Sequence, residues 1–360
     1  MTDQSRDFCT RLGLAHPIIQ APMAGGTTTP ELVAAVCDEG ALGSVGAAYL
    51  TPEQIKDAAA AVRARTNRGF CLNLFAGGYE ECRRQVDPTK MLDVVGHHHA
   101  ALGLPFPEAP PVTEDPFADQ IEAVIATQPH VFSFTFGLPD AALIARIKAC
   151  GSFVMGTATT VNEARHLAAA GVDAVIAQGA EAGAHRGTFL APFESAMIGT
   201  MALVPQIVDA VAPLPVIAAG GIMDGRGIVA ALALGASAVQ MGTAFLTTDE
   251  AGIPEAHKAY LASGAAADQT AVTRVFSGRP ARGVVNAFWR EAEALGIDAV
   301  LPFPRQNDLT RAMRAAAAKS GDTDRMALWG GQGAGIARRM KAAALIRTLI
   351  AEMDEVRGAL

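Results

Sequence analysis

Short apolar runs recur along this chain, and most consecutive runs are separated by a stretch long enough for one helix. The runs are almost continuously apolar, which is typical of parallel strands that are buried on both faces. The predicted strands are Pro17–Met23, Leu42–Gly46, Phe70–Phe75, Val131–Gly137, Phe153–Ala158, Ala174–Gly179, Pro215–Gly221 and Ala238–Thr243. Eight strand–helix units close into a ring, so we predict an α/β fold of the (β/α)8 TIM-barrel type.

Helix starts between the strands agree with this interpretation. Thr29-Pro30 and Thr51-Pro52 each place a capping hydroxyl before a proline at the first helical position. Thr160 and Glu163 have the spacing of a capping box. Helices that begin soon after strands are what a chain of strand–helix units requires.

The chain is longer than a barrel needs. It has 360 residues, whereas a barrel of this type typically takes about 250. We predict that residues 1–78, 112–250 and 325–360 form the barrel. The remaining segments, 79–111 and 251–324, would form a smaller, mainly helical domain over the barrel mouth, where it acts as a lid or contacts substrate.

Charge and composition exclude several classes of protein. The formal net charge is −7, and the lysines and arginines form no cluster, so we expect no nucleic-acid partner. We also expect no membrane span and, from the opening residues, no secretory signal. The five cysteines have no paired spacing, which favours a reduced, cytoplasmic protein.

Two common chemistries of barrels are disfavoured by the strand ends. A Schiff-base enzyme needs a lysine there, and none of the predicted strands ends in one. A metal enzyme needs several carboxylates or histidines, and Glu181 stands nearly alone. The run His97-His98-His99 lies in an insert and lacks spaced ligand partners, so we predict no metal site.

Amide side chains lie within four of the predicted strands, at Gln20, Asn73, Gln178 and Gln240. An amide can donate and accept hydrogen bonds at once, which suits the polar edge of a flat ring such as a flavin. The alternative is that these amides only satisfy one another.

Glycine turns follow the last two strands, at Gly220-Gly221 and Gly242-Thr243. Such turns leave backbone N–H groups open to a phosphate, and the helix that follows adds its positive end. Together with the amides, they predict a flat, phosphorylated ligand in the barrel mouth.

His185 lies in a loop rich in glycine and alanine, Gln178–Gly187, that follows the sixth predicted strand. This position puts its imidazole at the end of the barrel where active sites form. An unperturbed pKa near 6.5 suits proton transfer at neutral pH. We therefore predict that His185 is catalytic.

Several ordered motifs resemble those of the nitronate monooxygenases, formerly called 2-nitropropane dioxygenases. They are Pro17–Gly26, Phe70–Phe75, the His185 loop, Gln240–Thr243 and, pointing to class I, Phe132–Gly137 with Leu328–Gly333. The resemblance covers essentially the whole chain.

The resemblance implies an FMN cofactor and a set of residues that bind it. The isoalloxazine would contact Ala21, Pro22, Met23 and Asn73. The ribityl chain and phosphate would be held by Gln178, Gly183, Gly220, Gly221, Gln240, Met241, Gly242 and Thr243. Trp329 and Gln332 would fold back near the flavin.

The implied reaction is the oxidation of alkyl nitronates, such as propionate 3-nitronate, with O₂. It would proceed through a flavin semiquinone and yield carbonyl compounds with nitrite and nitrate. His185 would act as a base toward a neutral nitroalkane or as a hydrogen-bond donor to the nitronate. Phe303 stands in the substrate region where the family typically has tyrosine, and Arg186, Arg305 or Arg311 could hold a substrate carboxylate. Ala184 replaces a glycine that is usual in the family loop.

Two other functions stay open at this level. An FMN-dependent NAD(P)H reductase, acting on an enoyl thioester or a quinone, would use the same barrel and histidine loop. A non-catalytic sensor of a phosphorylated ligand would need the cavity but not His185. The sequence does not distinguish a monomer from a homodimer.

Overall fold

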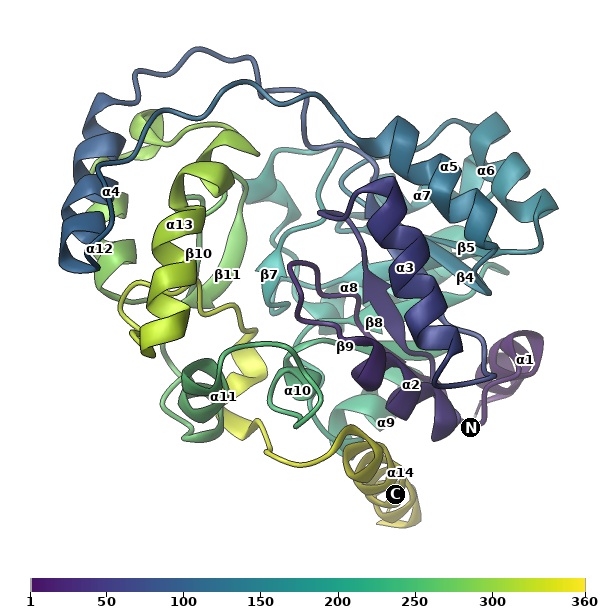
Figure 1. Cartoon of the computed structure of the whole chain (residues 1–360). Coiled ribbons are helices and arrows are strands. Elements are labelled where there is room, and N and C mark those ends of the chain that lie inside the picture. Colours follow the sequence, from purple (N-terminus) through teal and green to yellow (C-terminus); the bar gives the residue numbers. More distant parts are fainter. Residues whose placement is uncertain (1, 360) are drawn as a thin grey trace.

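A computed structural model describes residues 2–359, and its centre is a barrel of eight parallel strands (Figure 1). The strands are β1 (Ile18–Gln20), β2 (Ser44–Gly46), β3 (Cys71–Phe75), β4 (Val131–Thr135), β5 (Phe153–Ala158), β6 (Ala174–Gln178), β8 (Val216–Ala219) and β9 (Ala238–Met241). Their order is β1-β9-β8-β6-β5-β4-β3-β2. A parallel bridge between Ile19 and Leu42 joins the two ends of this order. The predicted (β/α)8 barrel is confirmed.

Helices surround the barrel. They are α2 (Pro30–Asp38), α3 (Pro52–Arg63), α5 (Phe117–Thr127), α6 (Ala141–Ala149), α7 (Val161–Ala169), α8 (Thr200–Val211), α9 (Gly225–Ala233) and α14 (Ala342–Ala359). The three predicted threonine caps are present, but the Glu163 carboxylate accepts from the Thr159 N–H, so Thr160 and Glu163 do not form the predicted capping box. Thr29 accepts from the Leu32 N–H, Thr51 forms a full capping box with Gln54, and Thr160 accepts from the Glu163 N–H.

One end of the barrel is closed by α1 (Asp3–Leu12). Phe8 and Leu12 of this helix are buried in a cluster with side chains from inside the barrel, including Ile19 and Met155. This packing covers the N-terminal ends of the strands and leaves the C-terminal ends as the side for a ligand. This is the end that barrel enzymes use.

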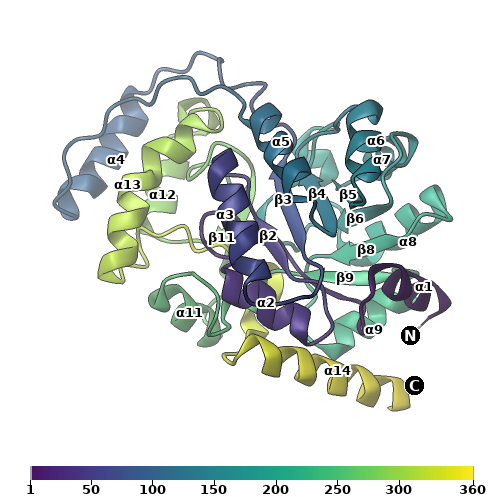
Figure 2. The ribbon, with the colours of Figure 1, turned by 45° about the vertical axis from the view of Figure 1, so that its right-hand side comes forward.

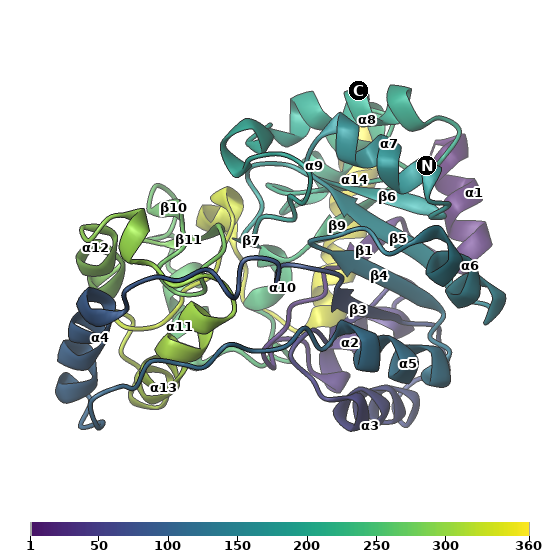
Figure 3. The same cartoon turned by 90° about the horizontal axis from the view of Figure 1, so that it is seen from above.

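The two predicted inserts form a second lobe, defined here as residues 79–111 and 251–324. It contains α4 (Thr89–Ala101), α11 (Glu255–Ala262), α12 (Ala287–Glu293), α13 (Arg305–Ser320) and the short helix η2 (Ile297–Ala299). Two extended segments lead from the barrel out to α4 and back to α5 (Figure 3). The division into two domains remains an interpretation.

The second lobe also contains a sheet that the sequence did not predict. β10 (Thr270–Thr273) pairs with β11 (Ala281–Val284), and β11 pairs with the two-residue strand β7 (Ala184–His185). β7 belongs to the histidine loop of the barrel. Two residues of the predicted loop are thus a strand that joins the two parts of the molecule.

After the second lobe the chain returns to the barrel. It passes the short helix η3 (Gln332–Ile336) and ends in α14, which packs against α2 and α9 (Figure 2). Two further short helices are η1 (Phe193–Ala196) and α10 (Thr243–Leu246). Within the described part of the chain, no helix is both long and apolar enough to cross a bilayer.

Candidate active site

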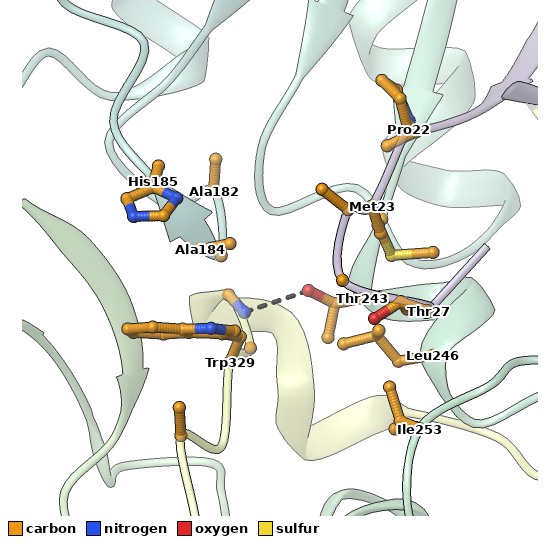
Figure 4. A pocket seen from close by; sticks show the side chains of 18 of the residues that line it. Pro22, Met23, Thr27, Ala182, Ala184, His185, Thr243, Leu246, Ile253 and Trp329 are labelled. Carbon is orange, nitrogen blue, oxygen red and sulfur yellow. Dashed lines mark hydrogen bonds between the residues drawn. The ribbon is translucent and has the colours of Figure 1, made fainter. Parts of the chain in front are cut away.

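A cavity of about 550 Å³ lies between the C-terminal ends of the barrel strands and the second lobe. His185 and Trp329 stand on one side of it, and Met23 and Thr243 lie across from them (Figure 4). The cavity is therefore bounded by segments that are far apart in the sequence.

Most residues predicted to bind the cofactor line this cavity. They are Ala21, Pro22, Met23, Asn73, Gln178, Gly183, Gly220, Gly221, Gln240, Met241, Gly242, Thr243 and Trp329. Gln332 is the exception, because its side chain is exposed and only its backbone N–H is used, as a donor to the Glu181 carbonyl. Gln332 does not line the cavity, and its predicted place near the flavin stays a prediction.

The four strand amides differ in what they still offer a ligand. Gln20 is fully buried outside the cavity wall and accepts from the Ser44 N–H at 2.9 Å. Asn73 donates to the Ser133 hydroxyl, and Gln178 bonds to the histidine loop at both ends of its amide. For Gln20 and Gln178 the amides mainly serve the protein.

Gln240 is different, because its Oε1 is buried and has no hydrogen-bond partner in the described structure. This residue lines the cavity. A buried acceptor without a donor is costly. A ligand with an N–H or O–H group at its polar edge would satisfy it.

Backbone turns after the last two barrel strands form the other end of the cavity. Gly220 and Gly221 have φ values of +112° and +73°, which favour glycine. Gly242 precedes α10, a short extra helix in the position where many barrels bind phosphate. Thr243 Oγ1 accepts from the Gly331 N–H at 3.0 Å, so this end is tied to the returning chain. The cradle fits a phosphate group.

His185 is held at the cavity edge by the sheet and by aromatic rings. Its Nε2 lies 2.9 Å from the Ser277 hydroxyl. Ring centroids of Phe136 and Trp329 lie 5.5 and 5.9 Å away. Burial, with further contributions from the positive charges of Arg279 and Arg314, lowers the pKa of His185 from 6.5 to about 3. The imidazole is therefore neutral at physiological pH.

Ala184, next to His185, has a φ of +57°. A non-glycine residue in this left-handed region costs roughly 1–2 kcal/mol. The pairing of β7 with β11 holds it there. The departure from glycine noted in the sequence thus carries real backbone strain beside the candidate catalytic residue.

Arg186, which was predicted to bind substrate, does not line the cavity. Its side chain is buried away from the cavity, and its guanidinium donates to the backbone carbonyls of Gly179, Gln178 and Ala196. Arg305 is also outside the cavity wall, with its Nε donating to the Pro110 carbonyl. Both guanidinium groups hold loops together.

Phe303 is likewise buried outside the cavity wall. Its ring packs edge-on against His185, with centroids 6.1 Å apart, and against Tyr79 at 5.3 Å. It supports the imidazole from behind, so the predicted direct contact with substrate is not supported by its position.

The positive groups that do line the cavity are Arg311 and Arg314 of α13. Burial lowers the pKa of Arg314 to about 10, so it stays charged at neutral pH. Sequence reasoning named Arg311 and missed Arg314. Arg314 lies three residues after Arg311 and therefore on the same face of α13, together with Ala315 and Ala318, which also line the cavity. This helical spacing is the signal that would have identified Arg314. Among the described lining residues there is no carboxylate.

Comparison with known proteins agrees over almost the whole chain. A family model described as nitronate monooxygenase matches residues 6–352. A probable nitronate monooxygenase from Staphylococcus aureus (strain Newman) is 41% identical over 347 residues, which cover 96% of each protein.

Solved structures show the same relationship. A nitroalkane oxidase from Streptomyces ansochromogenes has a TM-score of 0.87 at 41% identity and covers 98% of this chain and 99% of its own. FabK from Thermotoga maritima has a TM-score of 0.77 at 29% identity, with the same coverage. Because the family model and these relatives span nearly all of the sequence, the chain belongs to the nitronate monooxygenase family.

Proposed function

We propose that this protein is an FMN-dependent enzyme that oxidises alkyl nitronates with O₂ to carbonyl compounds, with release of nitrite and nitrate. The observation that carries this proposal is the cavity wall, which combines a neutral imidazole with two arginines and has no carboxylate among its described residues. Arg311 is paired with Asp308 just outside the wall, whereas Arg314 forms no ion pair within the described part of the chain. Such a wall attracts an anion. A nitronate is an anion, whereas its parent nitroalkane is neutral. Membership of the family supports the same reaction.

FMN would fill the barrel side of the cavity. The unpartnered Gln240 Oε1 offers an acceptor to a ring or ribityl donor, and the Gly220–Gly221 and Gly242–Thr243 turns offer a seat for the phosphate. When bound, FMN supplies the redox chemistry, while the protein supplies position and charge.

His185 would bind the nitronate rather than generate it. A group with a pKa of about 3 is a weak base at neutral pH. As a neutral imidazole it can still donate one N–H to a nitronate oxygen. We therefore favour a preformed nitronate over a neutral nitroalkane as the substrate.

Arg314, which lines the cavity without an ion-pair partner among the described residues, suggests that the substrate carries a second negative group, as propionate 3-nitronate does. Changing Arg314→Gln should raise KM for propionate 3-nitronate roughly tenfold, because a charge-assisted hydrogen bond is lost. KM for ethyl nitronate, which has no carboxylate, should change little. Arg290→Gln, at an exposed position on α12, is the control. An equal effect on both substrates would contradict a carboxylate site.

The reaction is tested by the visible spectrum of the purified protein under anaerobic conditions. Nitronate, the parent nitroalkane, NADH and NADPH are added separately. A yellow protein whose flavin is reduced by nitronate, and by neither nicotinamide, would support the monooxygenase. Bleaching by NADH or NADPH with nitronate inert would make it a reductase on the same barrel. A protein that binds FMN and responds to none of them would favour a sensor.

A further inference from the structure

Two histidines and a glutamate meet in the second lobe, outside the cavity wall. His97 and His98 are neighbours in α4, and Glu291 comes from α12, 194 residues further along the chain. The Glu291 carboxylate faces both rings. One oxygen lies 3.1 Å from His97 Nδ1, and the other lies 3.0 Å from His98 Nε2. None of the three lines the cavity.

The spacing of these atoms suits a small divalent ion. One ligand atom from each residue lies within 4.8 Å of the others. Zinc bonds to histidine nitrogen and carboxylate oxygen are about 2.0–2.2 Å long, which places tetrahedral ligand atoms roughly 3.3–3.6 Å apart. Small side-chain rotations would therefore bring all three groups onto one ion.

His98 provides a second, independent observation. Its side chain is only 4% exposed, yet neither ring nitrogen has a well-oriented hydrogen bond in the described structure. The ring packs edge-on against Phe288 of α12, with centroids 5.2 Å apart. A buried imidazole held next to a carboxylate, without a good hydrogen bond, is what a metal ligand looks like before the metal is bound.

The surroundings allow a positive ion. The nearby Arg325 is paired with Asp322 at 2.6 Å, so its charge is balanced. His97 and Glu291 are partly exposed, which gives an ion a path from solvent. The neighbouring His99 does not belong to this group of ligand atoms, and its Nδ1 bonds to the Pro105 carbonyl at 2.7 Å.

We propose that His97, His98 and Glu291 bind one divalent transition-metal ion, with Zn²⁺ as the best match and water completing its shell. Imidazole and carboxylate are the ligand types that such an ion prefers. The ion would link α4 to α12. These helices already pack together through buried side chains such as Val95 and Phe288, so the ion would reinforce an existing contact between the insert and the rest of the second lobe.

The test is Zn²⁺ titration of tag-free, flavin-loaded protein by calorimetry, with Co²⁺ absorption as a report on coordination. We expect one Zn²⁺ per chain. His97→Ala and Glu291→Gln should each weaken binding by at least about tenfold, since each removes one of three ligands. Excess Zn²⁺ should raise the thermal midpoint of the wild-type protein and not that of either variant.

Two control variants separate this site from nonspecific binding. Glu293→Gln lies on the same helix and bonds to Thr273, and His166→Ala removes an exposed helical histidine. Both should bind Zn²⁺ as the wild-type protein does. No binding by the wild-type protein, or equal binding by Glu291→Gln, would overturn the proposal and leave a simple histidine–glutamate ion pair.

Discussion

The Ser277 hydroxyl forms a hydrogen bond with His185, and its direction is coupled to the tautomer of the imidazole. The hydroxyl oxygen lies 2.9 Å from His185 Nε2 and 3.1 Å from the Arg279 carbonyl oxygen. When the hydroxyl donates to Nε2, the imidazole proton sits on Nδ1 and can be donated to a nitronate. When it donates to Arg279, Nε2 is protonated and Nδ1 is an acceptor. Ser277 is thus a positioning residue in the proposed reaction.

Changing Ser277→Ala should lower kcat/KM for nitronate roughly tenfold, because the hydrogen bond that orients the His185 ring is lost. The flavin content should be unchanged, since Ser277 holds the imidazole rather than the barrel cradle. Steady-state kinetics with preformed nitronate measures the effect. Ser195→Ala, at an exposed position, serves as the control. Full activity in Ser277→Ala would show that the hydroxyl does not orient His185.

His257 is predicted to make the protein less stable in acid. Its side chain is 4% exposed, its Nε2 bonds to the Trp329 carbonyl, and burial lowers its pKa from 6.5 to about 4. Because the folded-state pKa is the lower one, the unfolded chain takes up the proton first. The stability due to the neutral side chain is complete above pH 6.5 and is lost as pH falls toward 4.

The change His257→Gln should therefore reduce the loss of stability between pH 7 and pH 5 by about 2 kcal/mol. Glutamine is neutral at both values and can still donate to Trp329. Urea unfolding at the two pH values provides the measurement. His166→Gln, on the surface of α7, should leave the difference as it is in the wild-type protein. If His257→Gln loses as much stability between pH 7 and pH 5 as the wild-type protein does, His257 does not contribute to the acid sensitivity.

At the scale of elements, the proposed phosphate-binding site can be tested by substitution in the turn between β9 and α10. Gly242 has a φ of −102°, so other residues are allowed there. A Cβ would lie 3.5 Å from Ala21 Cβ and 3.9 Å from Met23 Sδ, which are ordinary contacts. A larger side chain would thus fit the protein but occupy the cavity.

We expect Gly242→Val to fold and to bind FMN at least about tenfold more weakly. Flavin content after purification and titration of apoprotein with FMN measure this. Gly358→Val, where a Cβ would meet nothing within 4 Å, is the matched control. If Gly242→Val purified with a full complement of FMN, the phosphate would have to bind elsewhere.

The elements that sequence could predict are those fixed by local pattern. Apolar runs located all eight barrel strands, and threonine caps located three helix starts, because both signals lie within a few residues. The pairing of β7 with β11 joins Arg282 to Ala184, far apart in the chain, and leaves no local trace. The contact between Glu291 and His97 could not be predicted either, because the two residues are far apart in the chain. The prediction that Arg186 binds substrate followed from its charge, because the sequence does not show that its guanidinium donates to three backbone carbonyls.

At the scale of the whole molecule, the chain crosses between barrel and second lobe several times. The two extended segments lead to and from α4, β7 of the histidine loop pairs with β11, and α14 returns to pack on α2 and α9. Trp289 packs in the core of the second lobe, and Trp329 lines the cavity beside it. The Trp289 part of the intrinsic fluorescence therefore reports on the second lobe, whereas Trp329 and bound flavin would report on the cavity.

We predict that the two lobes unfold together, so damage to the barrel should be detected by both signals. Leu349 of α14 is fully buried against the barrel helices. Changing Leu349→Ala should lower the unfolding free energy by about 2–5 kcal/mol. Tryptophan fluorescence and flavin release, followed in the same urea titration, should shift by the same amount. Ile297→Ala, at an exposed position of the second lobe, should shift neither. If only flavin release moved, the crossings would not couple the lobes, and the cavity between them would open without global unfolding.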